Sequence, residues 1–247
     1  MVGWDDLYAE DVWREWANRH PLQITRDWID SLDRNAPCRV LDMGCGLGRH
    51  TVLLADLGFE VIASDPSPRA REATREKLAH QGLKATVIDA DMTSIPYPHE
   101  HFMGVLSIGV LEHNTKAGIE KALAEVHRVL APGGRVLASF TPRARWLHKD
   151  DPKYDMIEDN TIRRWGPEQV LHHLVDEREL GELFGAFAMK WMQPQTEIFT
   201  SHVVSLSSTE CTSARRKGPP SNAPHLTPAR HMAEGHERVK RVKWLAK

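Results

Sequence analysis

The fold is decided by the stretch Arg39-Val40-Leu41-Asp42-Met43-Gly44-Cys45-Gly46-Leu47-Gly48-Arg49-His50. Its apolar first half is typical of a short buried strand, and residues 51–57 that follow have helical spacing. Three glycines at alternate positions join strand to helix, and glycine lets a ligand approach the main chain closely. The start of the helix adds unpaired N–H groups. The stretch therefore predicts a strand, a glycine turn and a helix built around a ligand site.

The glycine spacing separates this turn from two other ligand-binding loops. A Gly-x-Gly-x-x-Gly run would indicate a dinucleotide site, and a P-loop would need Lys-Ser or Lys-Thr after the turn. The run Asp-x-Gly-x-Gly-x-Gly instead resembles the first motif of class I S-adenosylmethionine-dependent methyltransferases. In that family the turn passes under the methionine part of the cofactor, with the motif acid nearby. The resemblance implies that Asp42, Gly44, Gly46 and Gly48 bind S-adenosylmethionine.

Two further apolar runs end in an acid. The run 60–65 ends at Asp65, about 20 residues beyond the glycine turn, where a carboxylate is placed to accept hydrogen bonds from ribose hydroxyls. The alternative role of Asp65 is a cap on the loop, and ribose binding is favoured. The run 85–92 matches the family's third strand. The resemblance implies that Asp91 pairs with the adenine amino group and that Met92 packs on the ring, whereas Asp91 taken alone would be a turn cap.

A fourth strand is predicted over residues 102–109, and Ser107 and Gly109 near its end are expected to bind the cofactor. The loop that follows contains His113, and in the family methyl transfer takes place at this loop. His113 is the first candidate for a general base, because the unperturbed pKa of histidine lies near working pH. A structural hydrogen bond that holds the loop is the open alternative. Met103 replaces an aspartate that the family usually has, at the strand end away from the cofactor, so a structural effect is expected.

The second half of the core carries an architectural signature. Residues 116–130 have the spacing of an amphipathic helix, Pro132-Gly133-Gly134 follows, and residues 135–140 read as a fifth strand. This run resembles a recurrent signature of the same family. Five strand–helix alternations predict an α/β three-layer sandwich with a mainly parallel sheet. The resemblance covers residues 35–207 and implies a Rossmann-like seven-stranded sheet whose last strand is antiparallel, with a closing hairpin at 188–193 and 197–206.

The segments around this domain are assigned more coarsely. Residues 1–34, rich in tryptophan, are expected to form a helical cap on the sheet, with a lid over cofactor and acceptor as the alternative. Residues 142–170 look loop-like and polar, within an acceptor-side insertion at 142–175. His172-His173 precedes a helix that Asp176 and Glu179 would begin with a capping box. The histidine pair resembles a subgroup of bacterial small-molecule methyltransferases, including tellurite-resistance-type enzymes, and two surface histidines on a loop are the alternative.

Composition bounds the class of protein. The chain has 247 residues, 41% hydrophobic and 27% charged, and a net charge of −2, as in an ordinary globular protein. The N-terminus lacks the features of a signal peptide, and no apolar stretch is long enough to cross a membrane. Three cysteines are too few for a disulfide framework or a metal site, and no metal is expected. A cytoplasmic protein is therefore expected.

The C-terminal segment, residues 208–247, is expected to be a basic, flexible tail. Its residues 212–247 hold nine basic residues against two acids, a net charge of +7, among several prolines. Nucleic acid is a disfavoured partner because the chain has no global positive charge, although the tail is basic. The expected partner is a small-molecule acceptor, and the oligomeric state stays open.

The sequence thus predicts an S-adenosylmethionine-dependent methyltransferase that moves a methyl group to an oxygen, nitrogen or sulfur nucleophile by in-line displacement. Two other classes stay open. The first is an oxidoreductase with a nicotinamide cofactor, which the glycine spacing argues against. The second is a non-catalytic cofactor-binding or scaffold protein that acts through its basic tail.

Overall fold

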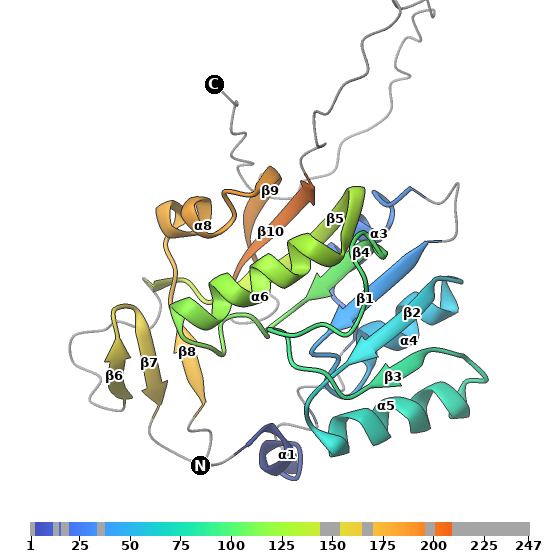
Figure 1. Ribbon diagram of the computed structural model, residues 1–247. Helices are drawn as coiled ribbons and strands as arrows, with labels where there is room; N and C mark the ends of the chain where they lie inside the picture. Colours follow the sequence, from blue (N-terminus) through green and yellow to red (C-terminus); the bar gives the residue numbers. More distant parts are fainter. Residues whose placement is uncertain are drawn as a thin grey trace, which may run out of the picture.

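The computed structural model describes residues 3–11, 15, 20–33, 38–143, 154–164, 170–195 and 201–208. In this part of the chain the main sheet has seven strands in the order β3-β2-β1-β4-β5-β10-β9 (Figure 1). The first five strands pair in parallel, and β10 is antiparallel to both of its neighbours. The predicted Rossmann-like architecture with a mainly parallel sheet is confirmed. The strands are Arg39–Met43 (β1), Glu60–Ser64 (β2), Thr86–Ile88 (β3), Phe102–Ser107 (β4), Leu130–Phe140 (β5), Phe187–Gln195 (β9) and Ser201–Ser208 (β10).

Two boundaries test the sequence-based expectations. The hairpin expected at 188–193 and 197–206 is confirmed by the antiparallel pairing of β9 with β10. The fifth strand begins at Leu130 instead of Arg135, so the expected boundary was wrong. The pairing register shifts here: Phe102 faces Leu130, but Gly104 faces Arg135. The Pro-Gly-Gly turn is therefore an irregularity inside the strand, which the local glycine and proline signal could not distinguish from a break.

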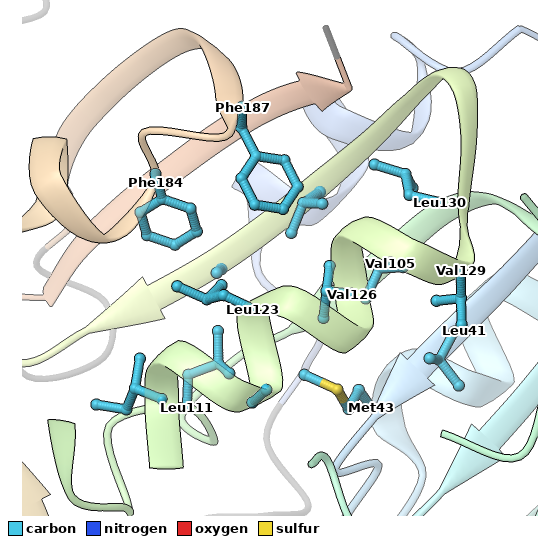
Figure 2. Close-up of a cluster of buried hydrophobic side chains, with 14 of the residues drawn as sticks. Leu41, Met43, Val105, Leu111, Leu123, Val126, Val129, Leu130, Phe184 and Phe187 are labelled. Carbon is cyan, nitrogen blue, oxygen red and sulfur yellow. The ribbon is translucent and has the colours of Figure 1, made fainter. Parts of the chain in front are cut away.

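One face of the sheet is covered by α6 (Lys116–Val129), the amphipathic helix expected from the spacing. Thr115 caps it by accepting a hydrogen bond from the Gly118 N–H. Figure 2 shows the apolar side of α6, with Leu123 and Val126, lying over Leu41 and Val105 of the sheet. Phe184, which directly follows α8 (Glu177–Leu183), joins the same buried cluster. Burial of such side chains contributes roughly 1.5–3 kcal/mol each.

The other face carries α3 (Gln23–Ile29) and α4 (Arg49–Asp56), while α5 (Pro68–His80) follows β2. Alternate residues of one strand point to opposite faces, so Val40 packs here with Trp28 and Leu54 while Leu41 packs under α6. Met103 packs on this second cluster at the amino end of β4, in agreement with the structural effect expected for it. Trp28 thus belongs to the helical layer that was predicted for residues 1–34. Trp13 and Trp16 lie outside the described residues, as does the tail from 209.

A second sheet corrects the expectation for the insertion. Residues predicted to be loop-like contain Tyr154–Glu158 (β6) and Thr161–Arg164 (β7), and Leu171–His173 (β8) pairs antiparallel with β7. Asn160 adopts a φ of +64° in the turn between β6 and β7, as asparagine in a tight hairpin does. The sequence did contain a hairpin signal, namely Asn160 in the turn and the β-branched residues beside it. The polar residues around them favoured a loop instead.

The histidine pair also differs from the surface loop that was the alternative. His172 and His173 lie in β8 and both are buried. Asp176 caps α8 by accepting from the Glu179 N–H, as expected. The Glu179 carboxylate contacts His173 and Asn160, so the reciprocal half of the expected capping box is replaced by contacts to the second sheet.

Candidate functional site

A cavity lies at the carboxyl ends of β1, β2 and β4, between the glycine turn and the N-terminal helix α1 (Trp4–Leu7). In Figure 1, α1 lies beyond the arrowheads of these strands. Ligands of open α/β sheets bind at this edge. The described residues that line the cavity are Trp4, Tyr8, Met43, Gly44, Cys45, Gly46, Leu47, Arg49, His50, Asp65, Pro66, Ala90, Asp91, Met92, Ile108, Gly109, Val110 and His113.

The glycine turn forms one wall through its backbone. Gly44 and Gly46 have φ angles of +70° and +52°, a region that L side chains rarely adopt. Both line the cavity, and a Cβ on Gly46 would lie 2.9 Å from the Tyr8 hydroxyl oxygen. Gly48, the N-cap residue of α4, has a φ of +80°. Its missing side chain allows Thr74 of α5 to approach closely. The three glycines therefore have two different tasks.

Asp65 connects the turn to the end of β2. The side chain is buried, and its two oxygens accept hydrogen bonds from the N–H groups of Gly46 and Ser67, each at 2.9 Å. Burial raises the pKa of Asp65, and these two bonds oppose that rise. Asp65 thus caps the loop, the alternative role, and also faces the cavity. An ionised carboxylate has about four acceptor positions, so capacity for further donors is left.

Three predicted cofactor ligands lie elsewhere. Within the described part of the chain, Asp42, Gly48 and Ser107 are outside the cavity wall. Asp42 is buried in β1 and accepts a hydrogen bond from the Thr51 hydroxyl at 2.6 Å, which ties the strand to α4. Burial raises the pKa of Asp42 to about 6. Asp42 therefore links β1 to α4, the two elements on either side of the glycine turn.

Asp91, Met92 and Gly109 line the cavity, as expected from their strand ends. One oxygen of the Asp91 carboxylate accepts from both the N–H and the hydroxyl of Thr93, so this acid also caps a turn. Met92 packs at the edge of the core cluster under α6. The Gly109 N–H donates to the Ser139 hydroxyl at 2.8 Å, which holds the end of β4 against β5.

His113 lines the cavity and makes the structural hydrogen bond that was its alternative role. The Nδ1 atom lies 2.9 Å from the carbonyl oxygen of Leu171 in β8. The imidazole ring meets the rings of Trp4 and His172 edge-on, with centroids 4.7 and 4.6 Å apart. Burial lowers the pKa of His113 to about 4, although the bond to Leu171 opposes this. The environment of His113 thus moves its pKa away from the unperturbed value on which the base assignment relied, toward the neutral ring at pH 7.

The N-terminal helix α1 contributes to one wall of the cavity, and the lid alternative for this segment stays a prediction. Trp4 and Tyr8 line the cavity. Asp5 anchors the helix, because its Oδ1 accepts from the Ser67 hydroxyl at 2.8 Å and from the Arg69 N–H at 2.9 Å. Ser67 is also the N-cap of α5. Tyr8 was not among the predicted site residues, although it is one of the aromatic side chains of the segment for which a lid was the alternative.

Arg49 is a second cavity residue that was not among the predicted site residues. It directly follows the glycine turn and begins α4, so its position in the motif was the available signal. Among the described residues no group of three or more metal-ligating side chains could hold a metal ion. In the same residues no helix is both long enough and apolar enough to cross a bilayer.

Comparisons with known proteins agree with this geometry. Residues 40–134 match the family model described as a methyltransferase domain. A demethylmenaquinone methyltransferase of Thermus thermophilus is 35% identical over 125 residues, which cover 49% of this chain and 56% of the relative. The chain spans about half the length of the curated relatives it matches.

Solved structures share the fold. A SAM-dependent methyltransferase of Methanosarcina mazei superposes with a TM-score of 0.64 at 20% identity, covering 78% of this chain and all of that one. The magnesium protoporphyrin IX methyltransferase of Synechocystis, solved with bound SAM, has a TM-score of 0.60 at 16% identity and covers 85% and 99%.

Proposed function

We propose that this chain, whose residues 40–134 form a class I S-adenosylmethionine-dependent methyltransferase domain, moves a methyl group to a small organic acceptor. The observation that carries the proposal is the place of Asp65. Its carboxylate joins the end of β2 to the glycine turn and faces the cavity. A buried acid in this position suits a ligand with neighbouring hydroxyl groups.

The residues of the cavity fit S-adenosylmethionine. Asp65 would accept from the ribose hydroxyls, Asp91 from the adenine amino group, and Met92 would pack on the adenine ring. Gly44 and Gly46 would lie beside the methionine part, and a side chain on either would meet Val110 or Tyr8 of the same cavity wall. Arg49 would balance the charge of the methionine carboxylate. When bound, the cofactor supplies a methyl group on a positively charged sulfur.

The other end of the cavity would receive the acceptor. The described lining residues include one arginine and two aspartates, Arg49, Asp65 and Asp91, which we assign to the cofactor. Among the other lining residues, we assign Trp4, Val110 and the neutral His113 to the acceptor, and these suit a small, uncharged organic molecule. The relative from Thermus thermophilus is named for demethylmenaquinone, an uncharged organic acceptor, which supports the acceptor's uncharged character.

His113 would act on an acceptor that carries a hydroxyl or amine proton. A carbonyl oxygen can only accept, so Nδ1 donates to Leu171 and carries the proton of the neutral ring. The lone pair on Nε2 is then the ring's acceptor, and it would orient the nucleophile and take its proton as the bond to the methyl carbon forms. A thiol acceptor ionises near neutral pH and would need no base. Alignment in a closed site supplies up to about 7–11 kcal/mol of the acceleration.

Two experiments test the proposal. Calorimetry with S-adenosylmethionine and with NADH should show binding of the first alone, and the reverse would favour an oxidoreductase. Turnover on a panel of thiols, metalloid oxyanions, amines and phenols is then read out as release of S-adenosylhomocysteine. Cofactor binding without turnover on any class of acceptor would favour a non-catalytic binding protein.

A further inference from the structure

The strand β8 lies against the loop that carries His113. The Leu171 carbonyl oxygen is 2.9 Å from His113 Nδ1, and the His173 N–H donates to the Glu112 carbonyl oxygen at 2.7 Å. The loop residues Glu112 and His113 are therefore hydrogen-bonded to the last and the first residue of β8, respectively. The position of β8 sets both the orientation of the His113 ring and the nitrogen that carries its proton, because the partner of one ring nitrogen determines the state of the other.

His173 holds β8 in place from the opposite side. Adjacent residues of a strand point to opposite faces, so His172 meets the His113 ring while His173 points away from it. The His173 side chain has 0% exposure. Its Nδ1 lies 2.7 Å from the Thr161 hydroxyl of β7, and its Nε2 lies 3.2 Å from the Glu179 carboxylate of α8.

The partners of His173 are themselves tied to the main domain. Thr161 donates to the Glu158 carboxylate at 3.0 Å, and that carboxylate also accepts from the Lys116 N–H at the start of α6. The Lys116 ammonium lies 3.4 Å from the Glu179 carboxylate. A buried polar network in which each member has partners specifies one arrangement. The contacts thus fix the second sheet relative to α6, the helix that packs on the core.

We propose that β8 is a positioning element of the acceptor site and that His173 is its positioning residue. Through β8, His173 keeps the Leu171 carbonyl against His113 Nδ1, so that Nε2 is the acceptor in the cavity. His173 is absent from the described residues that line the cavity, so it acts through His113 and touches neither cofactor nor acceptor. The role of Nε2 in turnover rests on the proposed function, whereas the tautomer of His113 does not.

The tautomer can be measured without an acceptor. Long-range proton–nitrogen NMR of the ligand-free, 15N-histidine-labelled protein should show His113 neutral with its proton on Nδ1, assigned by loss of its signals in His113→Gln. In His173→Phe, which keeps a ring but loses both polar contacts, the Nδ1–H signature should give way to a mixture of tautomers. His101→Phe changes a half-buried histidine at the amino end of β4 and should leave the His113 signals unchanged.

If His173→Phe does not fold, Thr161→Val removes one contact of His173 at nearly constant shape and should shift the same signals. His173→Asn, which retains a donor near the Nδ1 position, should restore part of the wild-type signature. On an acceptor from the panel, His173→Phe should lower kcat about 10- to 100-fold through misalignment while cofactor affinity stays within about twofold. A wild-type proton on Nε2, or unchanged His113 signals in both Thr161→Val and His173→Phe, overturns the proposal. Failure of S-adenosylmethionine to bind would instead refute the proposed function.

Discussion

The Gly46 N–H donates to the Asp65 carboxylate at 2.9 Å, across 19 residues of sequence. This bond joins the glycine turn after β1 to the acid after β2, so the two strongest features of the sequence are parts of one structure. A single acid thus shapes the turn and faces the cavity. Changes at Asp65 and at Gly46 should accordingly both act on cofactor binding, by different physical routes.

Asp65→Ala should weaken binding of S-adenosylmethionine. Loss of hydrogen bonds to a charged acceptor costs about 1.5–3 kcal/mol, which corresponds to about 10- to 150-fold in the dissociation constant. Calorimetry measures the change, with circular dichroism as the check on folding. Asp89→Ala is the matched control, because Asp89 is exposed and pairs with Arg71. Unchanged affinity in a folded Asp65→Ala protein would show that the ribose assignment is wrong.

Gly46→Ala should impair cofactor binding more than Gly58→Ala. Both glycines have positive φ angles, so alanine at either position costs roughly 1–2 kcal/mol in backbone strain. At Gly58 no atom lies within 4 Å of the added Cβ, whereas at Gly46 it would displace the Tyr8 hydroxyl. The two variants should lose similar thermal stability, and Gly46→Ala should also lose affinity. Equal affinities in both variants would contradict the assigned role of the turn.

Turnover of a hydroxyl or amine acceptor should be insensitive to protonation of His113 above about pH 5. A base must be neutral to accept a proton, and burial lowers the pKa of His113 to about 4, so the rate should fall only as pH drops toward that value. His113→Ala should reduce turnover by about 10²–10⁴-fold at unchanged cofactor affinity.

Single-turnover rates between pH 5 and 9 test this profile. A fall in rate near pH 6.5 that disappears in His113→Ala would show that the ring titrates normally. Near-full activity of the variant on a hydroxyl or amine acceptor would remove the base role. With a thiol acceptor the pH profile of the rate should follow the thiol's own ionisation. The rate of His113→Ala should then be close to that of the wild type.

The folding stability of Glu112→Gln relative to the wild type should increase as pH rises. Burial raises the pKa of Glu112 to about 8 from an ordinary 4.5, and among the described residues its Oε2 has no hydrogen-bond partner. Between these values the folded chain binds one more proton than the unfolded chain, so wild-type stability falls by about 1.4 kcal/mol per pH unit. Glutamine does not titrate and should remove that fall.

Chemical denaturation at pH 5, 6, 7 and 8 measures the gap between wild type and Glu112→Gln. Glu125→Gln is the control, because the pKa shift of Glu125 has the opposite direction: the bond to Arg128 lowers it. The contribution of Glu125 to folding stability is therefore constant over this pH range. A gap for Glu112→Gln that does not widen with pH would mean that Glu112 is ionised in the folded protein.

Asp5→Asn should speed release of the cofactor by loosening α1. Asp5 accepts two hydrogen bonds at the start of α5, and a partly exposed bond contributes about 0.5–1.5 kcal/mol, so about a 2- to 13-fold change is expected. Stopped-flow dissociation measures it, and Glu10→Gln on the exposed end of the same segment should have no effect. Identical release rates in the two variants would argue against α1 as a lid.

The sequence by itself determined the framework of this protein. The apolar runs around residues 40 and 62, the glycines between strand and helix, and the acids at strand ends are local patterns. They set element type and, through parallel pairing, bring Asp65, Asp91 and Gly46 to one edge of the sheet. Local spacing is sufficient here because strand and helix periodicity are short-range properties.

The tertiary structure alone decided how these residues are used. Asp42 faces Thr51 and not the cavity, and this depends on packing between β1 and α4. The lowered pKa of His113 comes from burial, and the hydrogen bond that opposes the lowering comes from a strand 58 residues away. The anchoring of α1 joins Asp5 to Ser67 over 62 residues. Burial and long-range hydrogen bonds depend on which segments meet in the fold, and that information is not present in the spacing of neighbouring residues.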